Sequence, residues 1–121
     1  MSFGQIFVNL FENASKYTPD GTAIDVSASR ISSELVNIVV RDHGPGVPTE
    51  LEEKLFEKFF RAAHQGASGA GLGLAICRGI AEAHGGAIRA KGAVGGGLEF
   101  HVTVPIGTAP PSTAENEAAI L

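Results

Sequence analysis

The sequence lacks several features that would place it in a specialised class. Among its 121 residues there is one cysteine, Cys77, and no tryptophan. A single cysteine excludes an internal disulfide and is typical of a protein from a reducing compartment. No apolar run approaches the ~20 residues that a membrane-spanning helix requires. The formal net charge of -4, without a basic patch, argues against a general nucleic-acid-binding protein.

What is abundant indicates one globular domain with ligand-binding loops. The chain has 44% hydrophobic residues, enough for a single hydrophobic core. It also has 16 glycines, which are clustered, and such clusters suit loops in which the backbone approaches a ligand closely. Residues 107–121 are rich in Pro, Ala, Ser, Thr and Glu. We therefore expect a domain over residues 1–106, followed by a flexible tail at 107–121.

Hydrophobic periodicity predicts an alternation of helices and paired strands. Amphipathic helices are expected over about 4–16 and 71–84, where apolar residues recur at helical spacing. Alternating or β-branched segments predict strands at 22–30, 35–41, 87–91 and 98–104. A short helical turn, capped by Thr49, is expected between the two halves. Pairs of strands separated by single helices predict an α+β fold, built as a two-layer α/β sandwich.

The first predicted helix carries a polar stripe. Asn9, Asn13 and Lys16 recur at i, i+4 and i+7 and therefore share one face. Asparagine oxygens can bind a hard cation such as Mg²⁺, and a nearby lysine can neutralise phosphate. A solvated helix face with routine amides remains the alternative. The other face of the helix is apolar and is predicted to be buried, with Ile6, Phe7, Leu10 and Ala14.

Two glycine-rich loops stand at the ends of predicted elements. The first, Asp-His-Gly-Pro-Gly at 42–46, places an aspartate at a strand end, where its carboxylate can accept a hydrogen bond from an exocyclic amine such as that of adenine. An ordinary turn remains the alternative. The second, Gly-Ala-Gly-Leu-Gly-Leu at 69–74, precedes a helix whose free backbone amides suit phosphate. Its spacing differs from that of a P-loop.

The order of these motifs carries more information than any one of them. An Asn-Asn-Lys helix, an Asp-x-Gly-x-Gly loop, a Phe-rich segment and a second glycine loop follow in succession. In this order the chain resembles the ATP-binding catalytic domain of sensor histidine kinases, whose fold is shared with gyrase, mismatch-repair ATPases and a heat-shock chaperone. The N, G1, F and G2 boxes of that family match residues 9–18, 42–46, 55–61 and 69–74. The resemblance implies a Bergerat ATP-binding fold, with a mixed sheet covered on one face by helices.

The resemblance also implies roles for individual residues. Asn13 would bind the Mg²⁺ that bridges the ATP phosphates, with Asn9 and Lys16 beside that cluster. Asp42 would accept the adenine amine, and Tyr17 would lie along the ring. Residues 47–68 would form a lid, anchored by Phe56, Phe59 and Phe60. The ATP-binding set implied in this way is Asn9, Asn13, Lys16, Tyr17, Asp42, Gly44, Gly46, Phe60, Arg61, Gly69, Gly71, Leu72, Gly73 and Leu74, with Asn13 as metal ligand.

One departure favours phosphoryl transfer over hydrolysis. The ATPases that share the fold use a glutamate one helical turn before the metal-binding asparagine as general base. Here that position is Asn9, which cannot act as a base at neutral pH. The resemblance therefore implies transfer of the γ-phosphoryl group to a histidine of a separate domain, with no catalytic residue in this chain. An anti-sigma-factor-type serine kinase switch of the same fold is the alternative, and a degenerate nucleotide-binding domain is a third.

The resemblance finally implies a larger parent protein. Residues 55–61, 71–80 and 82–86 are similar to the KdpD-type sensor kinases of potassium and osmotic signalling. The chain starts at the N-box helix, so strand residues that usually precede it in the family are expected to be missing from this fragment. The expected partners are the histidine-containing dimerisation domain of the same kinase and a cognate response regulator, without nucleic acid. We expect a cytoplasmic domain that makes no direct membrane contact, within a parent of the inner membrane.

Overall fold

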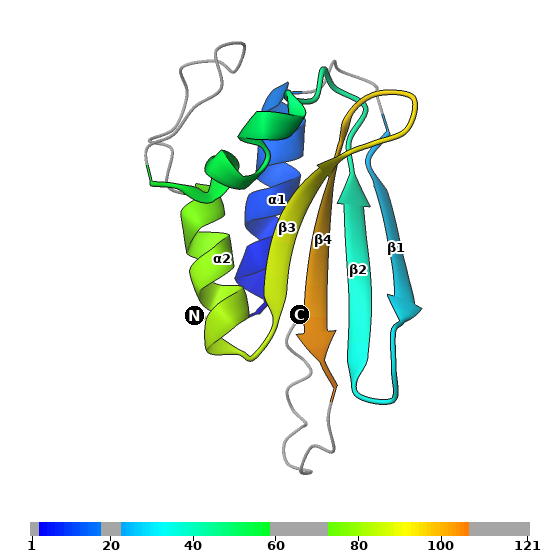
Figure 1. The fold of residues 1–121 in the computed structure, drawn as a ribbon, viewed down its shortest axis with the longest axis vertical. Coiled ribbons are helices and arrows are strands. Elements are labelled where there is room, and N and C mark those ends of the chain that lie inside the picture. Colours follow the sequence, from blue (N-terminus) through cyan, green and yellow to red (C-terminus); the bar gives the residue numbers. More distant parts are fainter. Residues whose placement is uncertain (1–2, 18–22, 59–72, 107–121) are drawn as a thin grey trace.

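The fold is a two-layer sandwich of helices on one face of a sheet (Figure 1). The computed structural model describes residues 3–17, 23–58 and 73–106. In chain order its elements are the helix α1 (Gly4–Tyr17), strands β1 (Asp25–Arg30) and β2 (Leu35–Arg41), 3-10 helices η1 (Thr49–Leu51) and η2 (Glu53–Phe56), helix α2 (Gly73–Ala83), and strands β3 (Ala87–Gly92) and β4 (Leu98–Pro105). This architecture confirms the predicted α+β sandwich. The predicted tail at 107–121 lies outside the described residues.

The four described strands form one sheet in the order β1-β2-β4-β3. Each neighbouring pair is antiparallel, whereas the resemblance implied a mixed sheet. The reason is the connectivity of these strands: β1 with β2 and β3 with β4 are hairpins, and β2 then pairs antiparallel with β4 in the centre.

Periodic apolar residues bind the two layers together. In α1, Ile6, Leu10 and Ala14 are spaced by four and are 0%, 0% and 3% exposed, so one stripe of the helix lies against the sheet. In β4, Phe100 and Val102 are buried and alternate with residues of the outer face. The core so formed comprises Ile6, Leu10, Val40, Leu55, Phe56, Cys77, Ile80, Ala81, Ile88, Leu98, Phe100 and Val102.

Two local expectations differ from the structure. The predicted strand 22–30 begins only at Asp25, and Val26, although on the helix side of β1, is 54% exposed. In Figure 1 both helices lie on the side of the view opposite to β1, and α2 contacts β3, so this edge strand is left uncovered. The expected Thr49 cap is also wrong, because Pro48 occupies the cap position of η1 and no side chain caps it. Neither described α-helix is long and apolar enough to cross a membrane.

Candidate nucleotide-binding site

The polar stripe of α1 faces the start of α2. Asn9 accepts a hydrogen bond from Gln5 Nε2 at its Oδ1 (2.9 Å) and donates from Nδ2 to the carbonyl of Gly73 (3.4 Å). The predicted N box and G2 box, 64 residues apart, are thus joined by one amide. Asn13 lies one turn further along α1 and is half-buried. The backbone of Lys16 and Tyr17 belongs to α1, but their side chains lie outside the described part of the structure.

Cys77 lies behind this contact, in the interface between the two helices. The thiol is 0% exposed and donates to the carbonyl of Ile6 (3.6 Å). Burial raises the pKa of the Cys77 thiol to about 11, although a hydrogen bond with Asn9 acts in the opposite direction. Cys77 therefore stays protonated at neutral pH and serves as a small core residue.

Asp42 is the buried charged side chain of the described residues, at 6% exposure. Its Oδ1 accepts hydrogen bonds from the amides of Gly44 (2.9 Å) and Leu98 (3.2 Å). A buried carboxylate needs such donors, because its desolvation is otherwise unfavourable. Within the described chain both bonds use Oδ1, which leaves Oδ2 as an acceptor for a ligand. Asp42, predicted from the sequence to accept the adenine amine, is thus also the buried carboxylate of the described residues.

A third glycine segment, at 95–97, completes the surroundings of Asp42. Gly97 has φ +93°, and a Cβ there would lie 2.2 Å from the carbonyl oxygen of Asp42. Gly46 has φ +72°, and its Cβ would lie 3.0 Å from the carbonyl oxygen of Gly97. This contact was not predicted from the sequence, although three consecutive glycines indicate a close approach of the backbone. The predicted G1 loop is therefore packed against the β3–β4 hairpin.

The described beginning of the predicted lid, residues 47–58, is fixed to α2 and β3. Arg78 of α2 donates to the carboxylate of Glu53 and, at 3.0 Å, to the carbonyl of Ile88. Its guanidinium lies 4.0 Å from the centre of the Phe56 ring, which packs edge-on against Phe100. The hydrogen bond from Arg78 holds the pKa of Glu53 below its usual value, against a smaller opposing effect of burial. Phe56 is thus a core residue within the described part of the predicted lid.

Arg78 was not predicted from the sequence, where it is the one basic residue of the segment that forms α2. The predicted G2 box is described only at its end. Gly73 opens α2, and a Cβ there would meet no atom of the described chain within 4 Å. Leu74, a member of the predicted ATP-binding set, packs against the core. The remaining predicted site residues lie outside the described ranges: Phe60, Arg61, Gly69, Gly71 and Leu72.

Comparison with protein families gives a match over almost the whole chain. Residues 1–108 match the family described as histidine kinase-, DNA gyrase B- and HSP90-like ATPase. The adaptive-response sensory kinase SasA of Crocosphaera subtropica is 44% identical over 103 residues, which are 84% of this chain and 27% of that protein. The sensor protein KdpD of Escherichia coli is 43% identical over 109 residues, 89% of this chain and 12% of that protein. The chain thus spans at most about a quarter of these relatives, and the KdpD subfamily is not distinguished from SasA.

Solved structures agree with this result. A mycobacterial sensor histidine kinase, MprB, superimposes with a TM-score of 0.79 at 34% identity, covering 84% of this chain and 70% of that one. Full-length ShkA, in complex with AMPPNP, superimposes with a TM-score of 0.72 at 38% identity, covering 87% of this chain and 21% of that one. The chain belongs to the histidine kinase-, DNA gyrase B- and HSP90-like ATPase family, as the ATP-binding catalytic domain of a sensor histidine kinase.

Proposed function

We propose that the chain binds Mg²⁺-ATP and transfers the γ-phosphoryl group to a histidine on a separate dimerisation domain of the same kinase. A response-regulator aspartate would then receive the group. The observation that carries the proposal is Asp42, a buried carboxylate with one oxygen fixed by two amides and the other left as an acceptor. Such an oxygen recognises an amine on a flat base and rejects a base that presents a carbonyl there. Asp42 is therefore assigned to the adenine amine.

The phosphates are assigned to the space between α1 and α2. The glycine loop at 69–74 leads into α2, whose N-terminal amides and dipole favour an anion, and Gly73 presents no side chain there. The donor chemistry of α1 fits a magnesium ion, because Asn13 offers a neutral amide oxygen and leaves the remaining positions to water and phosphate. The ion, when bound, would neutralise charge on the phosphates. Asn9 and Lys16 are assigned to the same cluster.

The chain supplies binding and positioning rather than proton transfer. Asn9 stands one turn before Asn13, and its amide is engaged with Gln5 and Gly73. An amide at this place cannot take a proton from water at neutral pH, which favours transfer to a protein acceptor over hydrolysis. The domain that presents the histidine would also supply any base.

The finer assignments rest on the relatives. A KdpD-like role in potassium or osmotic signalling is supported by one relative and by the sequence of residues 55–61, whereas SasA kinases match equally well. The partners implied by either kinase are the same kinase's dimerisation domain and a response regulator. A cytoplasmic position for this domain, and an inner-membrane parent, belong to the KdpD-like alternative.

The test is a pair of measurements on the chain and its acceptor. Calorimetric titration with a non-hydrolysable ATP analogue, with and without Mg²⁺ and with a GTP analogue as control, should show magnesium-dependent, adenine-selective binding. Incubation with radiolabelled ATP and a separately produced dimerisation domain should then label the histidine of that domain. A folded chain, checked by circular dichroism, that binds no ATP analogue would contradict the proposal.

A further inference from the structure

We propose that Arg41 is a positioning residue for Asp42, acting through the β3–β4 hairpin (residues 93–97). This inference deepens the proposed function and rests on the assignment of Asp42 to the adenine base. Arg41 is the last residue of β2 and precedes Asp42 directly, but its side chain lies on the outer face of the sheet, away from the core. It therefore acts on the carboxylate from outside the site.

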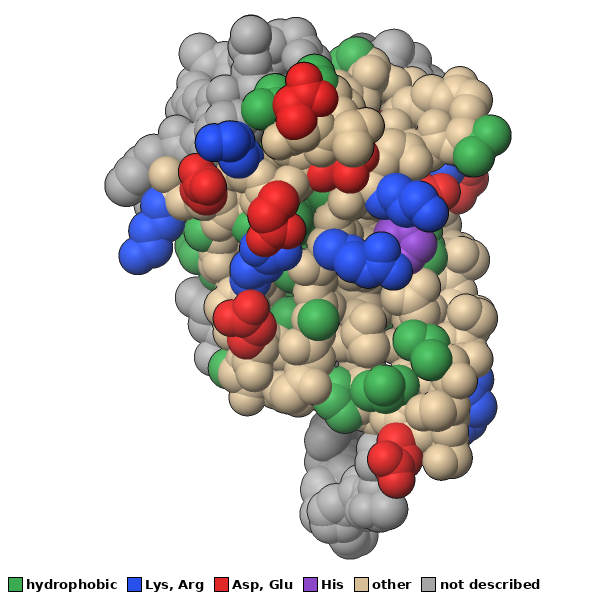
Figure 2. Space-filling view, in the orientation of Figure 1, with side chains coloured by type: hydrophobic (Ala, Val, Ile, Leu, Met, Phe, Trp, Pro, Cys, Tyr) green, Lys and Arg blue, Asp and Glu red, His purple; other side chains and the backbone are tan. Residues whose placement is uncertain are grey.

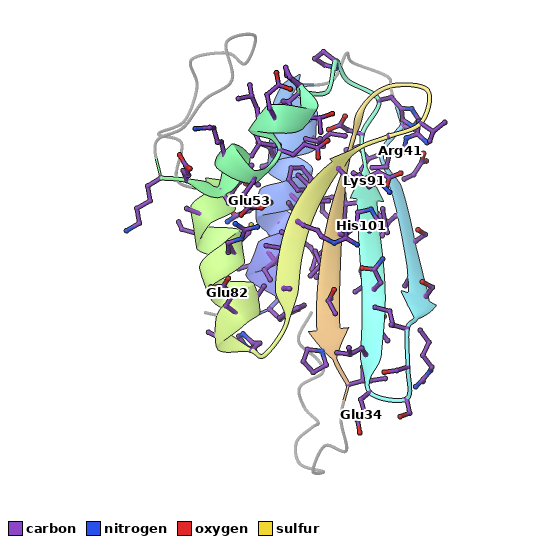
Figure 3. The ribbon with its side chains drawn as sticks, viewed as in Figure 1. Glu34, Arg41, Glu53, Glu82, Lys91 and His101 are labelled. Atoms are coloured by element: carbon purple, nitrogen blue, oxygen red, sulfur yellow. The ribbon has the colours of Figure 1, made fainter. Side chains whose placement is uncertain are left out.

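The side chain of Arg41 holds the hairpin by its backbone. Nη2 donates to the carbonyl of Val94 (2.8 Å) and to that of Gly96 (3.2 Å), across 53 and 55 residues of sequence. Figure 3 shows Arg41 reaching this hairpin from β2. Hydrogen bonds from a charged guanidinium are stronger than those between neutral groups. They fix two carbonyls of one short loop to the strand that carries Asp42.

The hairpin has two backbone hydrogen bonds of its own, from Ala93 to Gly97 and from Gly96 to Ala93 (both 3.1 Å), and Arg41 adds a link from outside the loop. Gly95, Gly96 and Gly97 have φ of +87°, +112° and +93°, so three successive residues are held in a conformation that only glycine adopts readily. Glycine loses the most backbone freedom on ordering. The side chain of Val94 at the hairpin tip is 91% exposed and contributes almost no packing.

The hairpin in turn sets the carboxylate of Asp42. The amide of Leu98, directly after the hairpin, donates to Asp42 Oδ1, and the amide of Asp42 donates to the carbonyl of Leu98 (3.0 Å). Gly97 lies so close that a Cβ would meet the Asp42 carbonyl oxygen at 2.2 Å. If the hairpin shifts, Leu98 moves with it and Oδ1 loses a donor. The Gly44 amide then remains as the one described donor to Oδ1, so the direction of the free oxygen is less well fixed.

The neighbours of Arg41 leave it available for this task. Figure 2 shows Lys and Arg side chains gathered around a histidine on this face of the molecule. Glu99 lies opposite Arg41 in the strand register, yet its carboxylate pairs with His101 (2.8 Å). No described carboxylate forms an ion pair with Arg41. The described hydrogen bonds of its guanidinium are the two from Nη2 to the hairpin carbonyls, while Nε is buried without a partner among the described residues.

The test compares three variants of the chain without and with nucleotide. Arg41→Met keeps an aliphatic side chain and removes the donors, and Arg41→Lys keeps the charge. Arg89→Met is the matched control, because Arg89 lies on the same outer face in β3 and has no described contact with the hairpin. Amide hydrogen exchange at Leu98 is measured by NMR without nucleotide, and ATP and GTP analogues are titrated by calorimetry.

For Arg41→Met we expect exchange at Leu98 to accelerate about tenfold and the preference for the ATP over the GTP analogue to fall by a similar factor. Arg41→Lys should restore part of both, and Arg89→Met should change neither. Unchanged exchange at Leu98 in Arg41→Met would overturn the inference even if the parent binds ATP. Faster exchange with unaltered base preference would overturn the link to Asp42. A folded parent that binds no ATP analogue would instead overturn the proposed function, and this inference with it.

Discussion

At the scale of single residues, Asp42 carries the greatest functional weight. Replacing it with alanine should lower affinity for an ATP analogue at least about tenfold and reduce the preference for ATP over GTP, because the acceptor for the base amine is gone. The amides of Gly44 and Leu98 would also lose their acceptor. Calorimetric titration measures the first effect. Equal affinity in Asp42→Ala and parent would show that this carboxylate does not contact the base.

The same substitution should also weaken the fold. Two amides without their acceptor are expected to lower the free energy of unfolding by about 1–3 kcal/mol. Urea denaturation measures this term separately from binding. Asp42→Asn is the informative companion, because it can keep an oxygen toward the two amides while its second atom becomes a donor. Asp42→Asn should therefore recover more of the free energy of unfolding than of the preference for the ATP over the GTP analogue.

A further prediction for a single residue concerns Cys77, whose thiol should be unreactive in the folded chain. At pH 8 a disulfide reagent such as DTNB should label it at least about 100-fold more slowly in buffer than in denaturing urea. With the folded pKa raised from 9.0 to about 11, the thiol's contribution to stability is complete below pH 9. It is lost as the pH rises through 11, because the unfolded chain ionises first. Rapid labelling of folded protein would contradict the buried position.

At the scale of elements, the η2–α2 contact predicts a dependence on pH. The folded-state pKa of Glu53 is lowered by Arg78, so this pair stabilises the fold above the ordinary carboxyl pKa of 4.5 and the contribution is lost as the pH falls through the lower folded value. Glu53→Gln should reduce the free energy of unfolding at pH 7 by less than about 1 kcal/mol, since Glu53 is largely exposed.

The measurement is urea denaturation of Glu53→Gln and the parent between pH 3 and 7. The two curves should differ at neutral pH and converge in acid. Glu50→Gln, in the neighbouring η1, is the control, because Glu50 has no ion pair among the described residues. A difference that persisted below the folded pKa of Glu53 would mean that the carboxylate charge is not its source.

Two glycines, one within α2 and one just after it, give a matched prediction about packing. Gly86, after α2, would place a Cβ 2.1 Å from the carbonyl oxygen of Thr103, whereas a Cβ at Gly79 inside α2 would meet no described atom within 4 Å. Gly86→Ala should therefore destabilise the chain by about 1–3 kcal/mol, through backbone displacement. Gly79→Ala should stabilise it by about 0.5–1 kcal/mol, because alanine favours a helix. Thermal unfolding of both variants tests this opposite pair, and shifts of the same sign would contradict it.

At the scale of the whole molecule, local patterns predicted the elements but not the contacts between them. Helical and strand periodicity placed α1 and β2 almost to the residue, and the alternation in β1 correctly gave its faces. This alternation shows which side chains of β1 point to which face of the sheet, but not whether a helix packs on that face. It could therefore not show that the helices leave β1 uncovered. Arg41 and Arg78 lie beside apolar runs but were given no role from sequence, because the partners of their side chains are 53 and 25 residues away in sequence. Only the folded chain brings such partners together.

The residues of the candidate site are also brought together only by folding, and this leads to a prediction for Asn13. Asn13 on α1 and the glycine loop before α2 are far apart in sequence, and the contact of Asn9 with Gly73 joins their helices. If Asn13 binds the magnesium ion, the parent should lose affinity for an ATP analogue when EDTA is added. Asn13→Ala should bind about tenfold more weakly with Mg²⁺ and be insensitive to EDTA. Ser15→Ala, on the exposed side of α1, should behave like the parent. If Asn13→Ala kept the full response to Mg²⁺, the metal ligand would have to lie elsewhere, and the phosphate assignment between α1 and α2 would fail with it.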